Sequence, residues 1–342
     1  MPPFTTTLLQ WFRENGRELP WRQTCDPYAI WLSEIILQQT RIEQGRPYWE
    51  RFIHRWPTVE DLAAASEDEV LREWQGLGYY SRARNLHAAA RQIVARGGFP
   101  TTIEGLRALK GIGDYTAAAI GSFAFDLPAA VVDGNVFRVL SRYYGISTPI
   151  NTTEGKHEFA ALAQNLLPTS LNGERQVGAY NQAIMDFGAL QCTPKSPDCL
   201  SCPLQETCSA FREGRVGEYP VKLKKLTVRE RHLIYIYIRY KGETAIHRRS
   251  AGDIWQGLYE PLLAESRDGF RESGGGPLVP LCQNVKHVLT HRVLYADFYL
   301  WEPDERPSLP DGYFWIPESD IDHYAVPRLI ERLLETLNNS NT

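Results

Sequence analysis

The sequence predicts a two-domain protein in which an all-α half precedes an α+β half. Three observations lead to this prediction. Apolar residues recur at spacings of three and four up to about residue 210. A polar stretch with Pro220 and the lysines 222, 224 and 225 follows. Beyond it, β-branched and aromatic residues dominate two runs. A chain of 342 residues is long enough to bury two cores.

Composition places the chain among ordinary globular proteins, with 43% hydrophobic and 23% charged residues. Its 37 Lys and Arg against 41 Asp and Glu give a net charge of −4, so overall charge does not indicate a nucleic-acid binder. No apolar run approaches a membrane span, and the start Met-Pro-Pro-Phe-Thr-Thr-Thr lacks the regions of a signal peptide. We therefore expect a protein of the cytoplasm or nucleoid without a membrane partner.

The first helix with chemical content is predicted to begin at Asp26-Pro27, a common N-cap and first-turn pair. Apolar residues between Tyr28 and Leu37 cover this helix nearly all round, so the helix should be buried. Glu34 lies within one of these apolar faces. Burial raises the pKa of a carboxyl group, which suits a general acid near neutral pH. The alternative is a structural glutamate that is neutralised by an arginine elsewhere in the chain.

Two glycine-containing turns follow. In Trp74-Gln-Gly-Leu-Gly-Tyr-Tyr-Ser-Arg-Ala-Arg-Asn85 the glycines predict a tight turn that pushes an aromatic ring outward beside arginines, an arrangement that can wedge between bases. The alternative is a core tyrosine pair with a solvated basic face. In Leu109-Lys-Gly-Ile-Gly-Asp-Tyr-Thr-Ala-Ala-Ala-Ile120 a hairpin should leave a helix N-terminus free for a phosphate, although this pattern is often only a turn. Asp133 then stands where the next helix needs a cap, which is its simpler interpretation.

Four cysteines, Cys192, Cys199, Cys202 and Cys208, stand in a proline-broken segment too short to bury a core. Two disulfides are one explanation, but clustered cysteines in a reducing compartment more often bind metal. Zinc usually takes two paired knuckles with a long spacer, whereas gaps of six, two and five residues in one loop favour a cubane iron–sulfur cluster.

In the C-terminal half, residues 231–240 and 287–301 share a composition typical of strands. A last amphipathic helix is predicted to start at Pro327 and to bury Leu329, Ile330, Leu333, Leu334 and Leu337. The glycine-rich residues 272–277 indicate a loop tip.

The order and spacing of these motifs resemble the helix-hairpin-helix superfamily of DNA base-excision glycosylases, and within it the adenine glycosylases of the MutY family. The resemblance rests on Trp31-Leu-Ser-Glu-Ile-Ile-Leu-Gln-Gln-Thr40, Gly76-Leu-Gly-Tyr-Tyr80, Asp133-Gly-Asn-Val136 and the cysteine spacing. It implies a helical glycosylase domain over residues 1–211 with a [4Fe–4S] cluster in the loop 192–208. A linker over 212–228 and a Nudix-like 8-oxoguanine-recognition domain over 229–342 would follow.

The resemblance further implies a monomer that removes adenine mispaired with 8-oxoguanine or guanine in double-stranded DNA, after flipping the adenine out of the helix. Glu34 would protonate N7 of the base, and Asp133 would stabilise or trap the oxocarbenium-like sugar. Tyr115 and Asn135 would support them. The substrate pocket is expected to be lined by Arg17, Leu19, Trp21 and Gln182. DNA contacts are expected from Gln38, Gln39, Tyr79, Arg82, Gly111, Gly113, Leu289, Thr290 and His291.

Departures from the family pattern refine this prediction. Superfamily members that also cleave the strand carry a lysine where this chain has Tyr115, so we expect a monofunctional glycosylase. The Nudix catalytic signature is not visible around residues 260–276, so the second domain should read DNA rather than hydrolyse nucleotides. Its reader loop, usually Phe-Ser-His, is Leu289-Thr290-His291 here and lacks the aromatic ring.

Two alternatives remain. An endonuclease III-like pyrimidine glycosylase with lyase activity is disfavoured by Tyr115 and by the second domain. A non-catalytic iron–sulfur protein, acting as an electron carrier or a DNA-binding scaffold, would leave the placement of Glu34 and Asp133 a coincidence. In the leading interpretation the cysteine loop is a fastener that holds Lys195 and the basic linker toward the DNA backbone.

Overall fold

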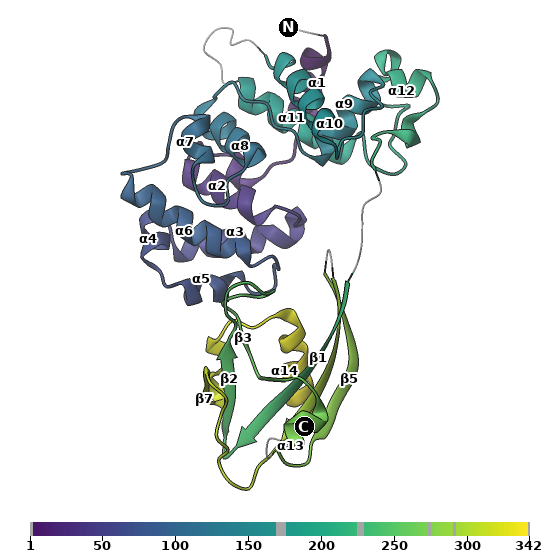
Figure 1. Ribbon diagram of the computed structural model, residues 1–342. Coiled ribbons are helices and arrows are strands. Elements are labelled where there is room, and N and C mark those ends of the chain that lie inside the picture. The colour runs from purple at the N-terminus through teal and green to yellow at the C-terminus, as the bar shows by residue number, and fades with distance from the viewer. Residues whose placement is uncertain (1–2, 169–175, 224–228, 273–274, 290–291, 341–342) are drawn as a thin grey trace. The chain divides into compact units, whose positions relative to one another are not determined.

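The computed structural model describes residues 3–168, 176–223, 229–272, 275–289 and 292–340 (Figure 1). The chain forms two compact units. The first consists of residues 1–63 and 88–224, and the second of residues 64–87 and 225–342. The expected order, helices first and an α+β part second, is confirmed. No helix in the described part of the chain is long and apolar enough to cross a membrane.

The helices of the N-terminal part follow one another with short connections. They are α1 (Pro3–Asn15), η1 (Pro20–Arg22), α2 (Pro27–Ile36), α3 (Ile42–Arg55), α4 (Val59–Ala64), α5 (Glu67–Trp74), α6 (Ser81–Ala95), α7 (Ile103–Arg107), α8 (Asp114–Phe125), α9 (Gly134–Tyr144), α10 (Thr153–Asn165), α11 (Gln176–Leu190), η2 (Gln205–Thr207), α12 (Ser209–Arg212) and η3 (Val216–Glu218).

Helix α2 begins where the sequence predicts. The Asp26 carboxylate accepts hydrogen bonds from the backbone N–H groups of Tyr28 and Ala29, at 3.0 and 3.4 Å. These bonds satisfy two of the donors that a helix N-terminus leaves unpaired. Eight of its ten residues are buried, which confirms that the helix is apolar nearly all round.

The predicted hairpin lies between α7 and α8. Gly111 has a φ of 77°, which a side chain would disfavour, and Gly113 is the N-cap of α8. Asp133 caps α9, and Gly145 ends that helix with a φ of 69°. These caps fix both ends of α9.

The core of the first unit is built by α1, α8, α9, α10 and α11 around large apolar side chains. Its members include Phe4, Leu8, Val139, Phe159, Tyr180 and Phe187, all nearly inaccessible to solvent. Because α8, α9 and α11 pack on this core, the side chains on their remaining faces are held in fixed positions.

The second unit contains a sheet of seven strands and the helices α13 (Arg267–Glu272) and α14 (Arg328–Ser340). The strands are β1 (Arg229–Tyr240), β2 (Glu243–Arg248), β3 (Tyr259–Glu260), β4 (Leu262–Ala264), β5 (Val279–Val288), β6 (Arg292–Trp301) and β7 (Tyr313–Pro317). A 3-10 turn, η4 (Glu318–His323), leads to α14.

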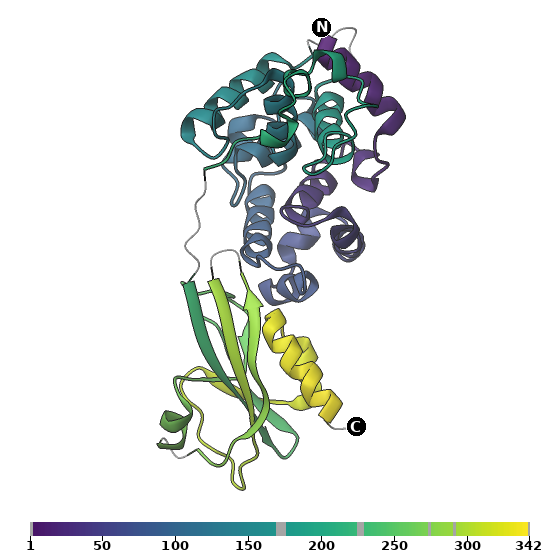
Figure 2. The same cartoon turned by 90° about the vertical axis from the view of Figure 1, so that its right-hand side faces the viewer.

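The sheet order is β3-β2-β1-β6-β5, with β4 paired to β1 and β7 to β2. The central pair β1 and β6 is parallel, with Arg229 opposite Arg292 and Ile238 opposite Trp301, and the other pairs are antiparallel. Helix α14 lies against one face of this sheet (Figure 2). As predicted, Leu329, Ile330, Leu333 and Leu337 are buried and Leu334 is partly buried.

The structure differs from the sequence-based expectation around residues 287–301. His287 and Val288 end β5, and β6 begins only at Arg292. The Leu289 N–H donates a hydrogen bond to the Arg292 carbonyl at 2.8 Å. Two antiparallel strands of similar composition give no composition signal at the boundary between them. The short α13, just before the glycine-rich loop, was not predicted either.

Residues 216–223 pack on the helical unit. Tyr219 is buried, the Ile150 N–H donates to the Val221 carbonyl at 3.0 Å, and Asn151 bonds both polar backbone groups of Leu223 at 2.8 and 2.9 Å. The chain past Arg212 therefore continues along the first unit up to Leu223.

Candidate functional site

One cavity in the first unit has Glu34 in its wall. Its volume is about 70 Å³. All four residues predicted for the substrate pocket, Arg17, Leu19, Trp21 and Gln182, line the same cavity. Further lining comes from residues that the sequence did not single out, namely Arg22, Ile30, Ser33, Leu37, Ile42, Phe123 and Met185.

Three elements hold these side chains. The single turn η1 starts at Pro20 and fixes Trp21 and Arg22 next to each other. The Trp21 ring packs edge-on against Trp49, with centroids 5.4 Å apart, so its orientation is set by the core. Helix α2 supplies Glu34, and α11 supplies Gln182.

Glu34 is partly buried, and the Tyr115 hydroxyl donates a hydrogen bond to its Oε2 at 3.0 Å. Burial raises the pKa of Glu34 to about 7, although the Tyr115 hydrogen bond and the charge of Arg22 lower it, while the charge of Asp133 raises it further. Among the described residues, Glu34 has no ion-pair partner. The group is thus able to exchange a proton near neutral pH.

Asp133 serves as the N-cap of α9. It accepts hydrogen bonds from the backbone N–H groups of Asn135 and Val136, both at 2.8 Å, and from the Asn135 amide at 2.9 Å. Burial nevertheless raises the pKa of Asp133 above its ordinary value, since it outweighs these bonds and the charge of Arg138. Asp133 can therefore cap α9 and at the same time act on Glu34 through its charge.

Tyr115 and Asn135 each contact one of the two carboxylates. Burial and the neighbouring Glu34 and Asp133 raise the pKa of Tyr115 well above its usual value, so its hydroxyl remains a hydrogen-bond donor. The Asn135 side-chain oxygen accepts from Arg138 at 2.8 Å, which fixes the amide toward Asp133. The four residues predicted as catalytic thus form two hydrogen-bonded pairs, Tyr115 with Glu34 and Asn135 with Asp133, and the charge of Asp133 acts on both Glu34 and Tyr115.

Asp186 is a charged residue of this region that sequence reasoning missed. It lies on α11, its side chain is fully buried, and it binds both Arg17 and Arg22. A signal was available, because Asp186 interrupts the apolar run Ala-Ile-Met-Asp-Phe-Gly-Ala as Glu34 interrupts its own helix. Nothing local to Asp186, however, points to partners more than 160 positions away.

The glycine turn before α6 has the predicted shape. Gly76 and Gly78 have φ values of 94° and 72°, and Tyr79 is 49% exposed while Tyr80 is buried. Arg82 is buried instead of projecting outward. Its guanidinium lies over the rings of Trp74 and Tyr79 and donates to the Gly78 carbonyl at 3.3 Å, so it braces the turn that presents Tyr79.

The remaining predicted DNA contacts of the helical part lie at turns. Gln39 is exposed with a φ of 56°, whereas Gln38 donates from its amide to Thr116 at 3.2 Å. Gly111 and Gly113 are exposed at the start of α8. In the second unit Leu289 directly follows β5, and Thr290 and His291 fall outside the described residues.

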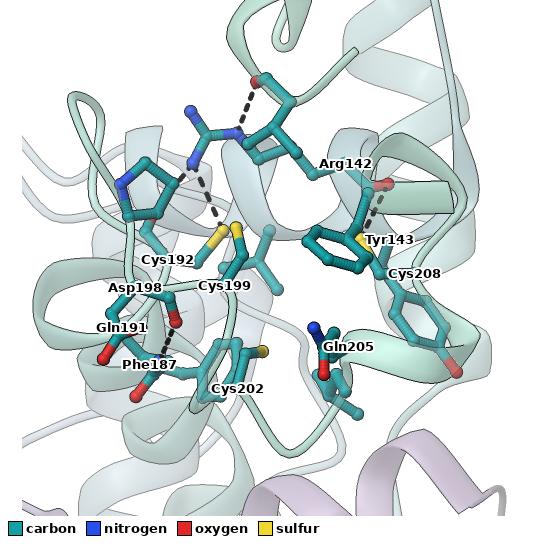
Figure 3. A pocket seen from close by; sticks show the side chains of 15 residues that line it. Arg142, Tyr143, Phe187, Gln191, Cys192, Asp198, Cys199, Cys202, Gln205 and Cys208 are labelled. Carbon is teal, nitrogen blue, oxygen red and sulfur yellow. Dashed lines mark hydrogen bonds between the residues drawn. The ribbon is translucent and has the colours of Figure 1, made fainter. Parts of the chain in front are cut away.

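The four clustered cysteines line a second cavity, of about 30 Å³, in the first unit. Figure 3 shows their sulfur atoms turned toward a common space below Arg142 and Tyr143. All four are thiols. In the described part of the chain no set of three or more His, Cys, Asp or Glu residues is arranged for one metal ion.

Arg142 fastens this loop to α9. Its guanidinium donates to the Thr193 carbonyl at 2.7 Å, to the Pro194 carbonyl at 3.2 Å and to the Cys192 sulfur at 3.4 Å (Figure 3). It also donates to the carbonyls of Val216 and Tyr219, at 3.1 and 3.3 Å. One buried cation thus joins the loop, the following segment and α9.

Burial makes the thiols of Cys199, Cys202 and Cys208 reluctant to ionise. It raises the pKa of Cys202 to about 11, and it raises the pKa of Cys199 and Cys208 as well, with the neighbouring thiolates adding to the effect. Four thiolates here would need compensating positive charge in addition to Arg142. A metal cluster supplies such charge.

Two family models match the chain. Residues 32–167 match the HhH-GPD superfamily of base excision DNA repair proteins, and residues 234–336 match the NUDIX domain. The first match spans Glu34, Tyr115 and Asp133, and the second spans most of the sheet unit.

Curated relatives agree with these matches. An adenine DNA glycosylase of Buchnera aphidicola from Schizaphis graminum is 37% identical over 75% of this chain and 73% of its own length. One from the Acyrthosiphon pisum strain is 29% identical over 97% of both chains. The mouse adenine DNA glycosylase is 42% identical over 63% of this chain, which spans only 43% of the mouse protein.

Solved structures resemble the helical part. A thermostable thymine-DNA glycosylase superimposes with a TM-score of 0.56 and 31% identity, over 61% of this chain and 95% of that one. Endonuclease III in a non-covalent DNA complex gives a TM-score of 0.52 at 22% identity, over 62% of this chain and 94% of that one, which shows a shared fold.

Proposed function

The chain belongs to the adenine DNA glycosylase family of base excision repair enzymes, and from that premise we propose that it removes adenine mispaired with 8-oxoguanine or guanine. The observation that carries the proposal is the position of Glu34, a carboxyl group with a pKa of about 7 in the wall of a cavity beside Arg17, Trp21 and Gln182. Its substrate is double-stranded DNA, and the reaction is hydrolysis of the N-glycosidic bond of a flipped-out adenine.

The proposed first step is proton donation to the base. Adenine leaves poorly as an anion, and protonation at N7 makes it a better leaving group. Protonated Glu34 is the acid in the cavity wall, and Tyr115 holds its carboxyl group in place. After departure of the base, the resulting carboxylate can accept a proton from the attacking water.

The proposed second step is stabilisation of the sugar cation. Loss of the base leaves an oxocarbenium-like sugar, and a nearby carboxylate stabilises it electrostatically or traps it covalently. Asp133 is suited to this role because three hydrogen bonds fix its orientation while burial limits its solvation. Water then completes hydrolysis.

Strand cleavage is not part of this proposal. A lyase needs an amine that forms a Schiff base with the sugar, and this chain has Tyr115 next to Glu34. We therefore expect a monofunctional enzyme. A borohydride-trapped enzyme–DNA adduct formed in high yield would contradict this expectation and would favour the endonuclease III-like alternative.

The four cysteines are proposed to hold a [4Fe–4S] cluster. Four thiols that face one apolar cavity, with spacings that suit a cubane, support this assignment. With all four thiolates serving as its ligands, such a cluster would cross-link the loop. It would take no part in the chemistry at the base. Cys199→Ala should therefore lower iron content, stability and DNA affinity together, whereas exposed Cys25→Ala should leave all three unchanged. A stable, tightly binding Cys199→Ala protein without iron would contradict the fastener role.

Recognition of 8-oxoguanine is proposed for the loop of Leu289, Thr290 and His291 in the Nudix-like unit. The hydroxyl of Thr290 and the imidazole of His291 can hydrogen-bond to the altered purine. The match of residues 234–336 to a NUDIX domain supports this assignment. Replacing Thr290 and His291 by alanine should reduce the preference for 8-oxoguanine over guanine by about tenfold, the value of one hydrogen bond to a base edge. The exposed His323→Ala serves as control. An unchanged preference would exclude this loop as the reader.

The central experiment measures single-turnover adenine release from a duplex with adenine opposite 8-oxoguanine. Glu34→Gln keeps the shape of the side chain but cannot donate a carboxylic proton, so the rate should fall by about a thousandfold. Glu158→Gln, an exposed change on α10, is the matched control. Equal rates for Glu34→Gln and the native protein would remove Glu34 as the acid. A duplex with thymine opposite guanine should release no base.

A further inference from the structure

Asp186 is the most heavily hydrogen-bonded carboxylate beside the Glu34 cavity. It accepts from the Arg17 backbone N–H at 3.0 Å and from Arg17 Nε at 2.9 Å. It also accepts from Arg22 Nη1 and Nη2 at 2.7 and 2.8 Å, and from Arg17 Nη2. Arg22 Nη1 donates in addition to the Arg17 carbonyl at 3.0 Å, so the two arginines and Asp186 form one rigid unit.

This arrangement binds two cations of the cavity wall to one fully buried anion, Asp186, which does not itself line the cavity. Both Arg17 and Arg22 line the cavity that Glu34 also lines. The charged and titratable groups that act on Glu34 are Tyr115 from α8, Arg22 from η1 and Asp133 at the start of α9. Of these, only Arg22 is a cation. An arginine released from Asp186 would have Glu34 as its nearest available carboxylate in this cavity.

A direct Arg–Glu34 ion pair would defeat the proposed chemistry. A guanidinium that pairs with a carboxylate stabilises the ionised form, and an ionised Glu34 cannot protonate a base. Asp186 prevents this pairing because its two carboxylate oxygens accept hydrogen bonds from both arginines. Those donors also outweigh its burial and hold the pKa of Asp186 at about 2, so it stays ionised in any physiological buffer.

We propose that Asp186 is a positioning residue that keeps Arg17 and Arg22 bound to α11 and thereby leaves Glu34 protonated for base release. The inference rests on the proposed function, since it concerns the acid of that same reaction. Asp186 does not touch the base. It acts by fixing which carboxylate the two arginines neutralise.

Asp186→Asn tests the proposal, because asparagine keeps the shape but loses the charge that holds two guanidiniums. The measurement is the rate of single-turnover adenine release between pH 5 and 9, with the full-length enzyme at a saturating concentration. In Asp186→Asn we expect the descending limb near pH 7 to move down by about one unit, so that the rate falls roughly tenfold at pH 7.5 and recovers at pH 5.5. A fall by the same factor at all pH values would indicate a merely structural role and overturn the proposal.

Two further variants keep the test decisive. Asp186→Glu restores a carboxylate and should return the limb toward its native position. Adding Arg22→Gln to Asp186→Asn removes the released cation and should move the limb back up, and a limb that stays low would contradict the mechanism. If Asp186→Asn does not fold, Arg22→Gln alone should move the limb upward from the native position, and a downward shift would overturn the proposal.

The outcome separates this inference from the proposed function. If Glu34→Gln releases adenine at the native rate, Glu34 is not the acid and the proposed function fails first. If Glu34→Gln is inactive while Asp186→Asn has the native pH profile, the acid assignment stands and only the role of Asp186 is wrong.

Discussion

The two ends of α9 differ in how their buried polar groups are satisfied. At the first turn, Asp133 and its neighbour Glu34 remain short of solvation, and burial raises the pKa of both. At the last turn, Arg142 is surrounded by carbonyl oxygens of Thr193, Pro194, Val216 and Tyr219. Helix α9 therefore has a carboxylate with a raised pKa, Asp133, at one end and a cation whose hydrogen bonds are all used, Arg142, at the other.

The difference teaches how stability and reactivity are divided within one unit. A buried group whose hydrogen bonds are complete holds structure together, and its loss should reduce the free energy of unfolding. A buried group whose charged form is disfavoured has a perturbed pKa and is suited to chemistry. Substitutions at the first turn of α9 should therefore change the reaction rate, whereas substitutions at its last turn should change the free energy of unfolding.

The largest expected effect is at the first turn. Asp133→Asn should slow adenine release by about a thousandfold, because it removes the charge opposite the sugar cation. Stability should change little, since asparagine is as good an N-cap as aspartate. Single-turnover kinetics and urea unfolding measure the two quantities on the same preparation. A large loss of stability in Asp133→Asn, together with adenine release at the native rate, would contradict the assignment of reactivity to the first turn of α9.

The next effect is at the last turn. Arg142→Gln should lower the free energy of unfolding by about 3 kcal/mol, because several buried carbonyls lose their donor. Folded protein should still release adenine within about threefold of the native rate, since Arg142 is not part of the Glu34 cavity. Exposed Arg212→Gln is the control for loss of an arginine charge. A stability equal to that of the native protein would show that the loop does not depend on this cation.

A smaller effect concerns pH. Because burial raises the pKa of Glu34 to about 7, the acid is present below that value and is lost as pH rises through it. Adenine release should therefore fall about fivefold between pH 7 and pH 8. Burial also destabilises the ionised form of Glu34. The contribution of this residue to the free energy of unfolding therefore declines as the pH rises from 4.5 to about 7. A rate that is constant from pH 6 to 8.5 would exclude a titrating acid in this range.

The smallest predicted effect is that of Tyr115→Phe. The Tyr115 hydroxyl stabilises ionised Glu34 by a hydrogen bond, so its removal should shift the descending limb to higher pH by less than about one unit. At pH 6 the rate should stay within about threefold of the native value. Tyr48→Phe is a control in the same unit. A shift to lower pH would show that Tyr115 acts on Glu34 in another way.

Much of the candidate site could be predicted because its signals are local. Asp26 before Pro27 set the start of α2, and helical spacing put Glu34 among apolar residues, as the structure has it. The family resemblance supplied Arg17, Leu19, Trp21 and Gln182, which indeed share one cavity with Glu34. Arg82 shows the limit of such signals, since its neighbours in sequence suggested an exposed cation and its guanidinium is buried under the Tyr79 turn.

The sequence by itself determined the helical and sheet halves, the caps of α2 and α9, the spacing of the cysteines and the membership of the family. Only the tertiary structure decided that Arg22 pairs with Asp186, 164 positions away, rather than with Glu34, and that Arg142 clamps the cysteine loop. The physical reason is the range of the interactions. Caps and helix faces depend on residues within one or two turns, whereas the partner of a buried charge is set by which distant helices pack together.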